Sequence, residues 1–256
     1  MRLPRRLAHE QGAELVDHLD ELRSRIIVAG VAVLAGTTVA YVFHHRIVEW
    51  LTRPLPPGHR HLTTFTVTEP FTTSLKVSFA AGFALALPVV LWQLWGFFAP
   101  ALDPRTQRSI RGMTVFAAGL LATGVGFGYR VGLPAALKFL VHYDHTIYNI
   151  QIRAADYISF AVLVLAACGA VFELPIVVLG LVRVRALTAA RLRSNRKIGY
   201  MIVACIGVAL PGIDPLTTII ETIPLANLFE ASIWLAVVFE RRWQLNRDQD
   251  LVSAGV

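Results

Sequence analysis

Long apolar runs alternate with short polar segments along the whole chain. Six of these runs are long enough, or nearly so, to cross a hydrocarbon core about 30 Å thick at about 1.5 Å per residue. The fifth is short, at about 13 residues, and the sixth is interrupted by Glu221 and Glu230. The pattern predicts an all-α membrane protein with six transmembrane helices, over Ile26–Phe43, Ser74–Phe98, Gly112–Tyr129, Tyr157–Val182, Ile198–Leu210 and Leu216–Val238.

The composition and the charge distribution favour the same class. Of the 256 residues, 55% are hydrophobic and 16% are charged, which is typical of a polytopic membrane protein. If the N-terminus lies inside, the inner segments hold 17 Lys and Arg residues and the outer segments hold six. Inner loops carry the excess of positive charge, so we expect both termini inside. The formal charge of +7 then reflects topology, and we expect no nucleic-acid partner.

This topology divides the chain into three parts. We expect a cytoplasmic amphipathic N-terminal segment over 1–25, a six-helix transmembrane domain over 26–238 and a cytoplasmic C-terminal tail over 239–256. The first 25 residues contain no apolar core, so they are not typical of a cleaved signal peptide.

No cluster of residues predicts a metal or a cofactor. Cys168 and Cys205 both lie inside apolar runs, where cysteine acts as a small packing residue. The first outer loop carries four histidines, but their spacing matches no compact ligand pattern. The chain also lacks a Gly-x-x-x-x-Gly-Lys nucleotide motif. The four histidines are His44, His45, His59 and His61.

The segment before the first span is amphipathic and acidic. Its leucines recur at helical spacing and give one apolar face. Glu21 stands four residues before Arg25, the favourable order for an ion pair on a helix. We expect a helix at the membrane surface that carries carboxylates and leads into the first span. The alternative is that these charges only solvate a helix end. The apolar positions are Leu15, Leu19, Leu22 and Ile26, and the acids are Asp17, Asp20 and Glu21.

One acid stands inside the fourth span, in the run Val171-Phe172-Glu173-Leu174-Pro175. A charged side chain at that depth costs about 2.5–3.5 kcal/mol on insertion scales, so an intramembrane glutamate is a functional candidate. The alternative is a neutral glutamate that forms a hydrogen bond to a neighbouring helix.

The run His18-Leu19-x-Glu21-Leu22-Arg23-x-Arg25 resembles the N-terminal signature of the TatC family, the six-helix receptor subunit of the twin-arginine protein translocase. The resemblance extends from about Glu14 to about Glu240 through several further elements. These are Arg53-Pro54-Leu55, Glu69-Pro70-Phe71, Trp95-x-Phe97-x-x-Pro100-x-Leu102, Phe172-Glu173-x-Pro175 and the turn Pro211–Pro215 that contains Asp214.

This resemblance implies a fold and roles for individual residues. The fold would be a concave bundle with short fifth and sixth helices. The residues that bind the signal peptide would be Leu19, Glu21, Arg23 and Phe97. The intramembrane or translocation residues would be Glu173, Pro175 and Asp214, and the outer-loop structural residues would be Pro54, Glu69, Pro70 and Phe71.

The resemblance also implies a setting and partners. The protein would be a non-enzymatic, multi-pass protein of the cytoplasmic (inner) membrane of a prokaryote that exports folded proteins using the proton-motive force. Its partners would be twin-arginine signal peptides, single-span subunits of the TatA/TatB type, membrane lipid and further copies of itself in a receptor complex.

Two positions depart from the family pattern. Thr106 stands where the family usually has a second recognition glutamate, and Thr218 belongs to a Thr-Thr pair that replaces the usual Ser-Gln pair for partner docking. Glu221 is an extra acid in the sixth span. Either Asp103 supplies the missing carboxylate, or Glu21 and its acidic neighbours act alone. We favour the second, since Asp103 precedes Pro104 and is biased away from helical geometry.

Two other classes of protein compete with this interpretation. A secondary transporter of a small solute would use Glu173 and Glu221 as coupling groups, but the two halves of the chain show no internal repeat. The second class, an intramembrane enzyme, is not supported by any motif. The sequence lacks His-Glu-x-x-His, Gly-x-Ser-x-Gly and paired intramembrane aspartates.

Overall fold

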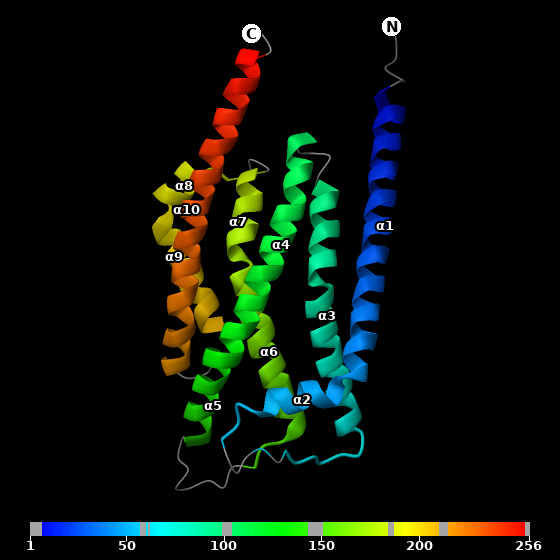
Figure 1. Cartoon of the computed structure of the whole chain (residues 1–256), viewed down its shortest axis with the longest axis vertical. Coiled ribbons are helices and arrows are strands. Elements are labelled where there is room, and N and C mark those ends of the chain that lie inside the picture. Colours follow the sequence, from blue (N-terminus) through cyan, green and yellow to red (C-terminus); the bar gives the residue numbers. More distant parts are fainter. Residues whose placement is uncertain are drawn as a thin grey trace. The chain divides into compact units, whose positions relative to one another are not determined.

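The computed structural model describes residues 7–56, 60, 62–98, 104–142, 151–183, 187–209 and 215–253. Over these residues the chain is helical, and its β-structure is limited to an isolated bridge between Thr63 and Arg153. The predicted all-α class is confirmed. The helices (Figure 1) are α1 Leu7–Val42, α2 His44–Thr52, α3 Glu69–Phe98, α4 Pro104–Phe127, η2 Gly128–Gly132, α5 Leu133–His142, α6 Ala154–Phe172, α7 Leu174–Arg183, α8 Ala189–Ser194, α9 Arg196–Ala209 and α10 Pro215–Ser253.

Among the described residues, five stretches of helix are long and apolar enough to cross a membrane. They contain most of the first four predicted spans and of the sixth, which confirms a multi-pass membrane protein. The fifth predicted span corresponds to α9, which has 14 residues and is therefore about 21 Å long. The count of six spans stays a prediction. The five stretches are Leu19–Val42, Glu69–Leu94, Gly112–Val141, Ala154–Val182 and Thr222–Glu240.

Two helical runs extend beyond the predicted bounds. After α4 the chain continues through the π-helical turn η2 into α5, so the helical run that was predicted to end at Tyr129 reaches His142. At the other end, α10 continues to Ser253, through most of the segment predicted as a tail. Residues 239–253 contain neither Gly nor Pro, and Arg, Gln and Leu favour a helix.

The fourth predicted span is a pair of helices that meet at Glu173. The break follows from Pro175, which has no N–H and whose ring clashes with a carbonyl one turn back. The last turn of α6 is tighter than an α-helical turn, because Glu173 N donates to Ala170 O, three residues back, at 3.2 Å. It then restarts as α7, with Ile176 N and Val177 N donating to Glu173 O at 3.0 and 3.1 Å.

The chain forms two compact units, one of residues 1–42 and 78–116 and the other of residues 43–77 and 117–256. In the first unit, α1 and α3 approach each other closely where Gly36 meets Gly82. A Cβ at Gly36 would lie 2.6 Å from the Gly82 carbonyl oxygen. Small residues permit such contact between membrane helices, so glycine is required at this crossing.

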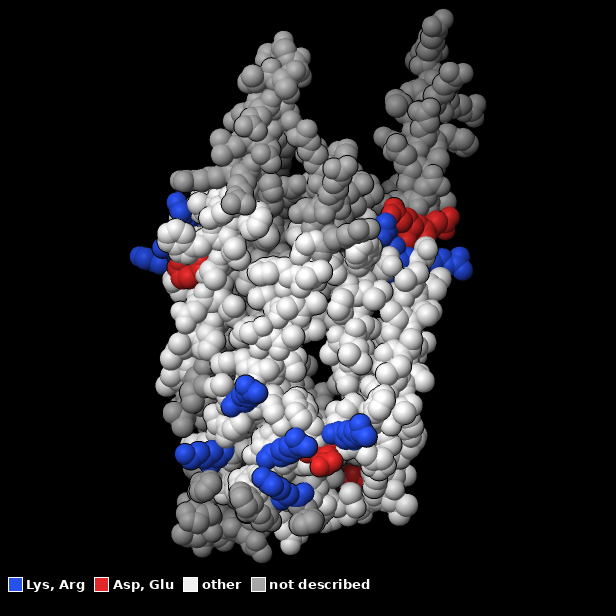
Figure 2. Space-filling model, in the orientation of Figure 1, with Lys and Arg blue, Asp and Glu red and all other residues white. Residues whose placement is uncertain are grey.

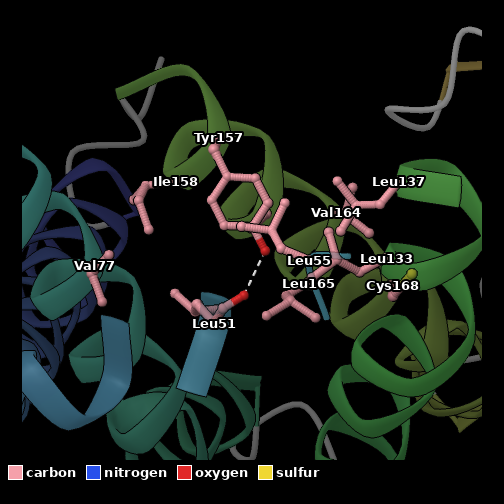
Figure 3. Packing of buried hydrophobic residues seen from close by; sticks show 11 residues of the cluster. Leu51, Leu55, Val77, Leu133, Leu137, Tyr157, Ile158, Val164, Leu165 and Cys168 are labelled. Atoms are coloured by element: carbon pink, nitrogen blue, oxygen red, sulfur yellow. Dashed lines mark hydrogen bonds between the residues drawn. The ribbon is translucent and has the colours of Figure 1, made fainter. Parts of the chain in front are cut away.

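The core of the second unit lies around the start of α6 (Figure 3). Tyr157 donates its hydroxyl to the Leu51 carbonyl at 2.5 Å, near the end of α2. Tyr129 stacks on Trp50 at 3.7 Å between ring centroids and donates to the Trp50 carbonyl at 2.8 Å. Tyr157 therefore gives a donor to a carbonyl at the end of the helix, and Tyr129 gives the Trp50 carbonyl a second donor beside Arg53 N. The other buried residues include Leu55, Val77, Leu133, Leu137, Ile158, Ala161, Val164, Leu165 and Cys168.

The Lys and Arg side chains of the second unit form two groups on the face drawn in Figure 2. Lys and Arg side chains gather over α2 and α5 at one end and over α8 at the other, with uncharged atoms between them. Within the same unit, α10 packs along α7 and α9 (Figure 1). A smaller core joins Val171, Val203 and Leu225 from α6, α9 and α10. An uncharged band between charged ends suits helices that cross a bilayer.

Candidate functional site

Glu21 lies in α1 near the start of the first candidate span, and it is paired with Arg25 one turn later. Arg25 Nη2 and Nε donate to Glu21 Oε1 at 2.6 and 3.0 Å. The Glu21 side chain is 34% exposed and the Arg25 side chain is 25% exposed. The carboxylate that the sequence singled out is therefore accessible at the surface and already bound to a guanidinium of the same chain.

The same guanidinium reaches across to α3 within the first unit. Arg25 Nη1 lies 3.4 Å from Gln93 Oε1 and 3.5 Å from the Gln93 carbonyl oxygen. Gly96 stands three residues further along α3, and a Cβ there would overlap Nη1 of Arg25. Glycine at this position gives the guanidinium the space that it occupies against α3.

The other residues predicted to bind a peptide belong to the same compact unit as this pair. Leu19 is 62% exposed, Arg23 is exposed and Phe97 is half-buried. A peptide that carries arginine beside apolar residues would find both kinds of contact in this unit. Among these residues, Glu21 has the ion pair with Arg25 described above. Gln93 and Gly96 were missing from the prediction.

Two predicted site residues, Asp103 and Asp214, lie outside the described residues, as do Pro100 of the family motif and His59 of the first outer loop. Thr106 lies in α4 and Glu221 in α10, and only their backbone is described. Thr218 is half-buried in α10.

Glu173 is buried at the break between α6 and α7, with 9% of its surface exposed. Neither of its carboxylate oxygens has a hydrogen-bond partner in the described part of the chain. The hydrogen bond to a neighbouring helix, which was the alternative interpretation, is thus absent among these residues. Pro175, which causes the break, is fully buried. A buried polar group without a partner is costly, so this position is a candidate for a role in function.

Glu69 joins three segments of the second unit at the start of α3. It is 3% exposed. Its Oε1 accepts from Arg153 Nε at 3.1 Å and from Ala155 N at 2.9 Å, and its Oε2 accepts from Phe65 N at 3.1 Å. The hydrogen bond from Arg153 and the attraction between the two charges raise the pKa of the Arg153 guanidinium. Glu69 therefore fixes the loop before α3 to the start of α6.

Backbone pairing and a ring contact strengthen this junction. Thr63 N donates to Ile152 O at 3.0 Å and Ala154 N donates to Thr63 O at 2.9 Å. The Arg153 guanidinium carbon lies 5.7 Å from the centre of the Phe65 ring, within cation–π range. The other residues predicted as structural here differ in exposure. Pro54 and Pro70 are half-buried and exposed respectively, and Phe71 is 60% exposed.

We expect Glu69→Ala to lower the melting temperature of the purified protein by about 5 °C or more, because two backbone N–H groups and Arg153 lose their shared acceptor. Glu49 is the matched control. It pairs with Arg53 at 4.0 Å with 73% of its side chain exposed, and exposed pairs contribute little. Thermal unfolding of both variants in detergent checks this. Equal shifts for Glu69→Ala and Glu49→Ala would contradict the role of Glu69.

A further ion pair connects α9 to α10. Tyr200 donates its hydroxyl to Glu230 Oε1 at 2.5 Å, and Arg196 Nη2 lies 3.5 Å from Glu230 Oε2. From the sequence, Glu230 stood out only as an interruption of an apolar run. Its partners lie 30 or more residues away, so their contact has no local signal. The pair fixes the short α9 against α10.

Comparison with known proteins identifies the family. The sequence profile described as TatC, Sec-independent protein translocase protein, matches residues 17–224. The Sec-independent protein translocase protein TatC of Carboxydothermus hydrogenoformans is 34% identical over 223 residues, covering 87% of this chain and 92% of that protein. The protein of the same name from Aquifex aeolicus is 35% identical over 232 residues, covering 89% of this chain and 96% of that protein.

A solved structure agrees with this match. It is described as the twin arginine translocase receptor TatC in DDM, and it superposes with a TM-score of 0.75 at 34% identity, covering 86% of this chain and 99% of that chain. The matches extend over most of the helices described above, including α1 with Glu21 and α6 and α7 with Glu173. The chain belongs to the TatC family of Sec-independent protein translocase proteins.

Proposed function

We propose that this chain is the signal-peptide receptor and core subunit of a twin-arginine translocase, which exports folded proteins. The observation that carries the proposal is the accessible Glu21 carboxylate in α1, near the start of the first candidate span, in a chain of the TatC family. A guanidinium binds a carboxylate through charge-assisted hydrogen bonds, often in pairs. The similar solved protein is itself described as a twin arginine translocase receptor, which supports the assignment.

A crosslinking experiment tests this proposal directly. A peptide with paired arginines and a photoreactive group beside them is irradiated with the purified chain in detergent. We expect a crosslink to residues around Glu21 in α1, and we expect a matched peptide with paired lysines to give much less product, because lysine lacks the forked geometry of arginine. Equal labelling by both peptides would contradict a receptor that reads arginine.

We infer that the chain has six spans with both termini inside, in the cytoplasmic (inner) membrane of a prokaryote. The excess of Lys and Arg in the proposed inner segments supports this orientation. It places the loop before α3 and the turn before α10 outside, and it places Glu21 on the cytoplasmic face, where a signal peptide arrives.

Cysteine labelling tests the orientation. In a background with Cys168→Ala and Cys205→Ala, we expect Arg60→Cys to react with an impermeant thiol reagent from outside. Asn195→Cys, between α8 and α9, should react only after the membrane is opened. Both native positions are exposed, so access is governed by the side of the membrane. Reaction of both cysteines from the same side would exclude this topology.

Assembly and energy follow from the same proposal. We infer that the chain binds single-span subunits of the TatA/TatB type, with Thr218 and Glu221 in α10 as docking positions, and that several copies share a receptor complex. The proton-motive force would drive export, and the chain would have no enzymatic activity of its own. Co-purification with single-span partners supports this assembly.

One observation favours a second candidate function. The carboxylate of Glu173 has no hydrogen-bond partner among the described residues, which also suits a coupling group in a secondary transporter of a small solute. Solute uptake by proteoliposomes that contain no signal peptide would favour this alternative, whereas dependence of transport on a signal peptide would exclude it.

A further inference from the structure

We propose that Arg25 is a built-in competitor for the peptide-binding carboxylate. It occupies Glu21 while the receptor is empty, an incoming arginine displaces it, and Gln93 keeps an acceptor for it afterwards. This inference rests on the proposed receptor function and adds a determinant of affinity to that site.

The bond that Arg25 makes is of the same kind as the bond proposed for the peptide. Two guanidinium nitrogens of Arg25 donate to one oxygen of Glu21, at 2.6 and 3.0 Å. An arginine of the peptide would offer this carboxylate the same donors. Arg25 is held four residues away on the same helix, so its effective concentration at Glu21 is high. A peptide must therefore compete with a ligand that is already in place.

Gln93 makes displacement possible without leaving the Arg25 charge unpaired. Its side-chain and backbone oxygens lie 3.4 and 3.5 Å from Arg25 Nη1, longer than the bonds to Glu21. These two acceptors remain when Glu21 is taken by another guanidinium. Gly96 keeps the space beside them open, because a Cβ there would overlap Nη1.

Competition of this kind lowers the affinity for every ligand that needs Glu21 by a common factor. A lysine ammonium forms a weaker, less directional bond to a carboxylate than a guanidinium does. A lysine peptide, whose affinity for the site is already low, therefore binds still more weakly. A peptide with paired arginines starts from a higher affinity and still binds. Arg25 thus sets how strong a ligand must be before it occupies the site.

The test is a binding titration of the purified full chain with a fluorescent twin-arginine peptide. We expect Arg25→Gln to bind this peptide about three- to tenfold more tightly, in the range expected for release of one partly exposed ion pair. In a Glu21→Gln background the same change should give no gain. Arg193→Gln is the charge-matched control, since Arg193 is exposed in α8, and its affinity should equal that of the wild type.

A second variant disturbs the position of Arg25 and preserves its charge. Gly96→Ala places a Cβ where Nη1 lies and closes the space beside Gln93, so we expect it to make displacement of Arg25 harder and to weaken peptide binding, opposite to Arg25→Gln. Gly30→Ala in α1 is its control, because a Cβ there meets no atom within 4 Å. A gain in Arg25→Gln without a loss in Gly96→Ala would support the competition and overturn the part assigned to Gly96.

A loss of peptide affinity in Arg25→Gln, in place of the expected gain, overturns the inference. If Arg25 helps to hold Glu21 for the peptide, Arg25→Gln will weaken binding, and if the pair is irrelevant, affinity will not change. Either result leaves the receptor function intact so long as the wild-type chain binds the twin-arginine peptide. Absence of binding by the wild type would instead reject the receptor function itself.

Discussion

We expect Glu21→Lys to abolish binding of a twin-arginine peptide while the chain inserts normally into the membrane. The change replaces an acceptor with a cation, which repels the arginines of the peptide. Glu21→Ala removes the acceptor alone and should weaken binding by tens-fold, since a hydrogen bond to a charged group contributes about 1.5–3 kcal/mol. Peptide titration of the purified variants measures both effects, and the amount of chain in membrane fractions reports insertion.

Asp20→Lys is the matched control for this experiment. Asp20 is adjacent to Glu21 and exposed, but it points away from the face that carries Glu21 and Arg25 by the geometry of the helix. We expect a loss of a few-fold at most, from longer-range repulsion screened by salt. If Asp20→Lys and Glu21→Lys lose affinity equally, the acidic segment attracts the peptide by its overall charge, and Glu21 is not a specific contact.

The pairing of Glu21 illustrates which features a sequence can predict. Arg25 follows Glu21 by four residues on a segment with helical periodicity, so their contact could be expected from local geometry. Gln93 and Gly96 lie about 70 residues away, and nothing near them in the sequence indicates that they meet Arg25. The predicted site was therefore right about the helix and the ion-pair spacing, and it lacked the part of the surroundings that comes from α3.

The same limit applies to the junction at Glu69. The motif around Glu69 suggested a structural role through its resemblance to a family, but the partner Arg153 is 84 residues away. The break at Glu173 is a different case, because its cause, Pro175, lies two residues away and acts through the backbone alone. Apolar runs likewise located the long helices. They could not give the π turn η2, where a Cβ at Gly128 would lie 3.0 Å from the Cβ of Cys168 in α6.

We expect Glu173→Ala to reduce export of a twin-arginine substrate by about tenfold or more while peptide binding stays unchanged. The physical reason is the position of the carboxylate. It is buried where Pro175 interrupts the helix, and its oxygens have no hydrogen-bond partner among the described residues. A polar group kept there at a cost is available to a substrate or partner during export. Export of a reporter protein and peptide titration of the purified chain measure the two effects separately.

Two further variants separate a polar role from a packing role at this position. Glu173→Gln keeps the size and hydrogen-bonding capacity of the side chain without its charge, so we expect it to retain part of the export activity. Glu173→Leu fills the same space with an apolar group that has no desolvation cost, so it should be stable and inactive. Normal export by Glu173→Leu, at equal amounts in the membrane, would show that neither the carboxylate nor any hydrogen bond to it serves translocation.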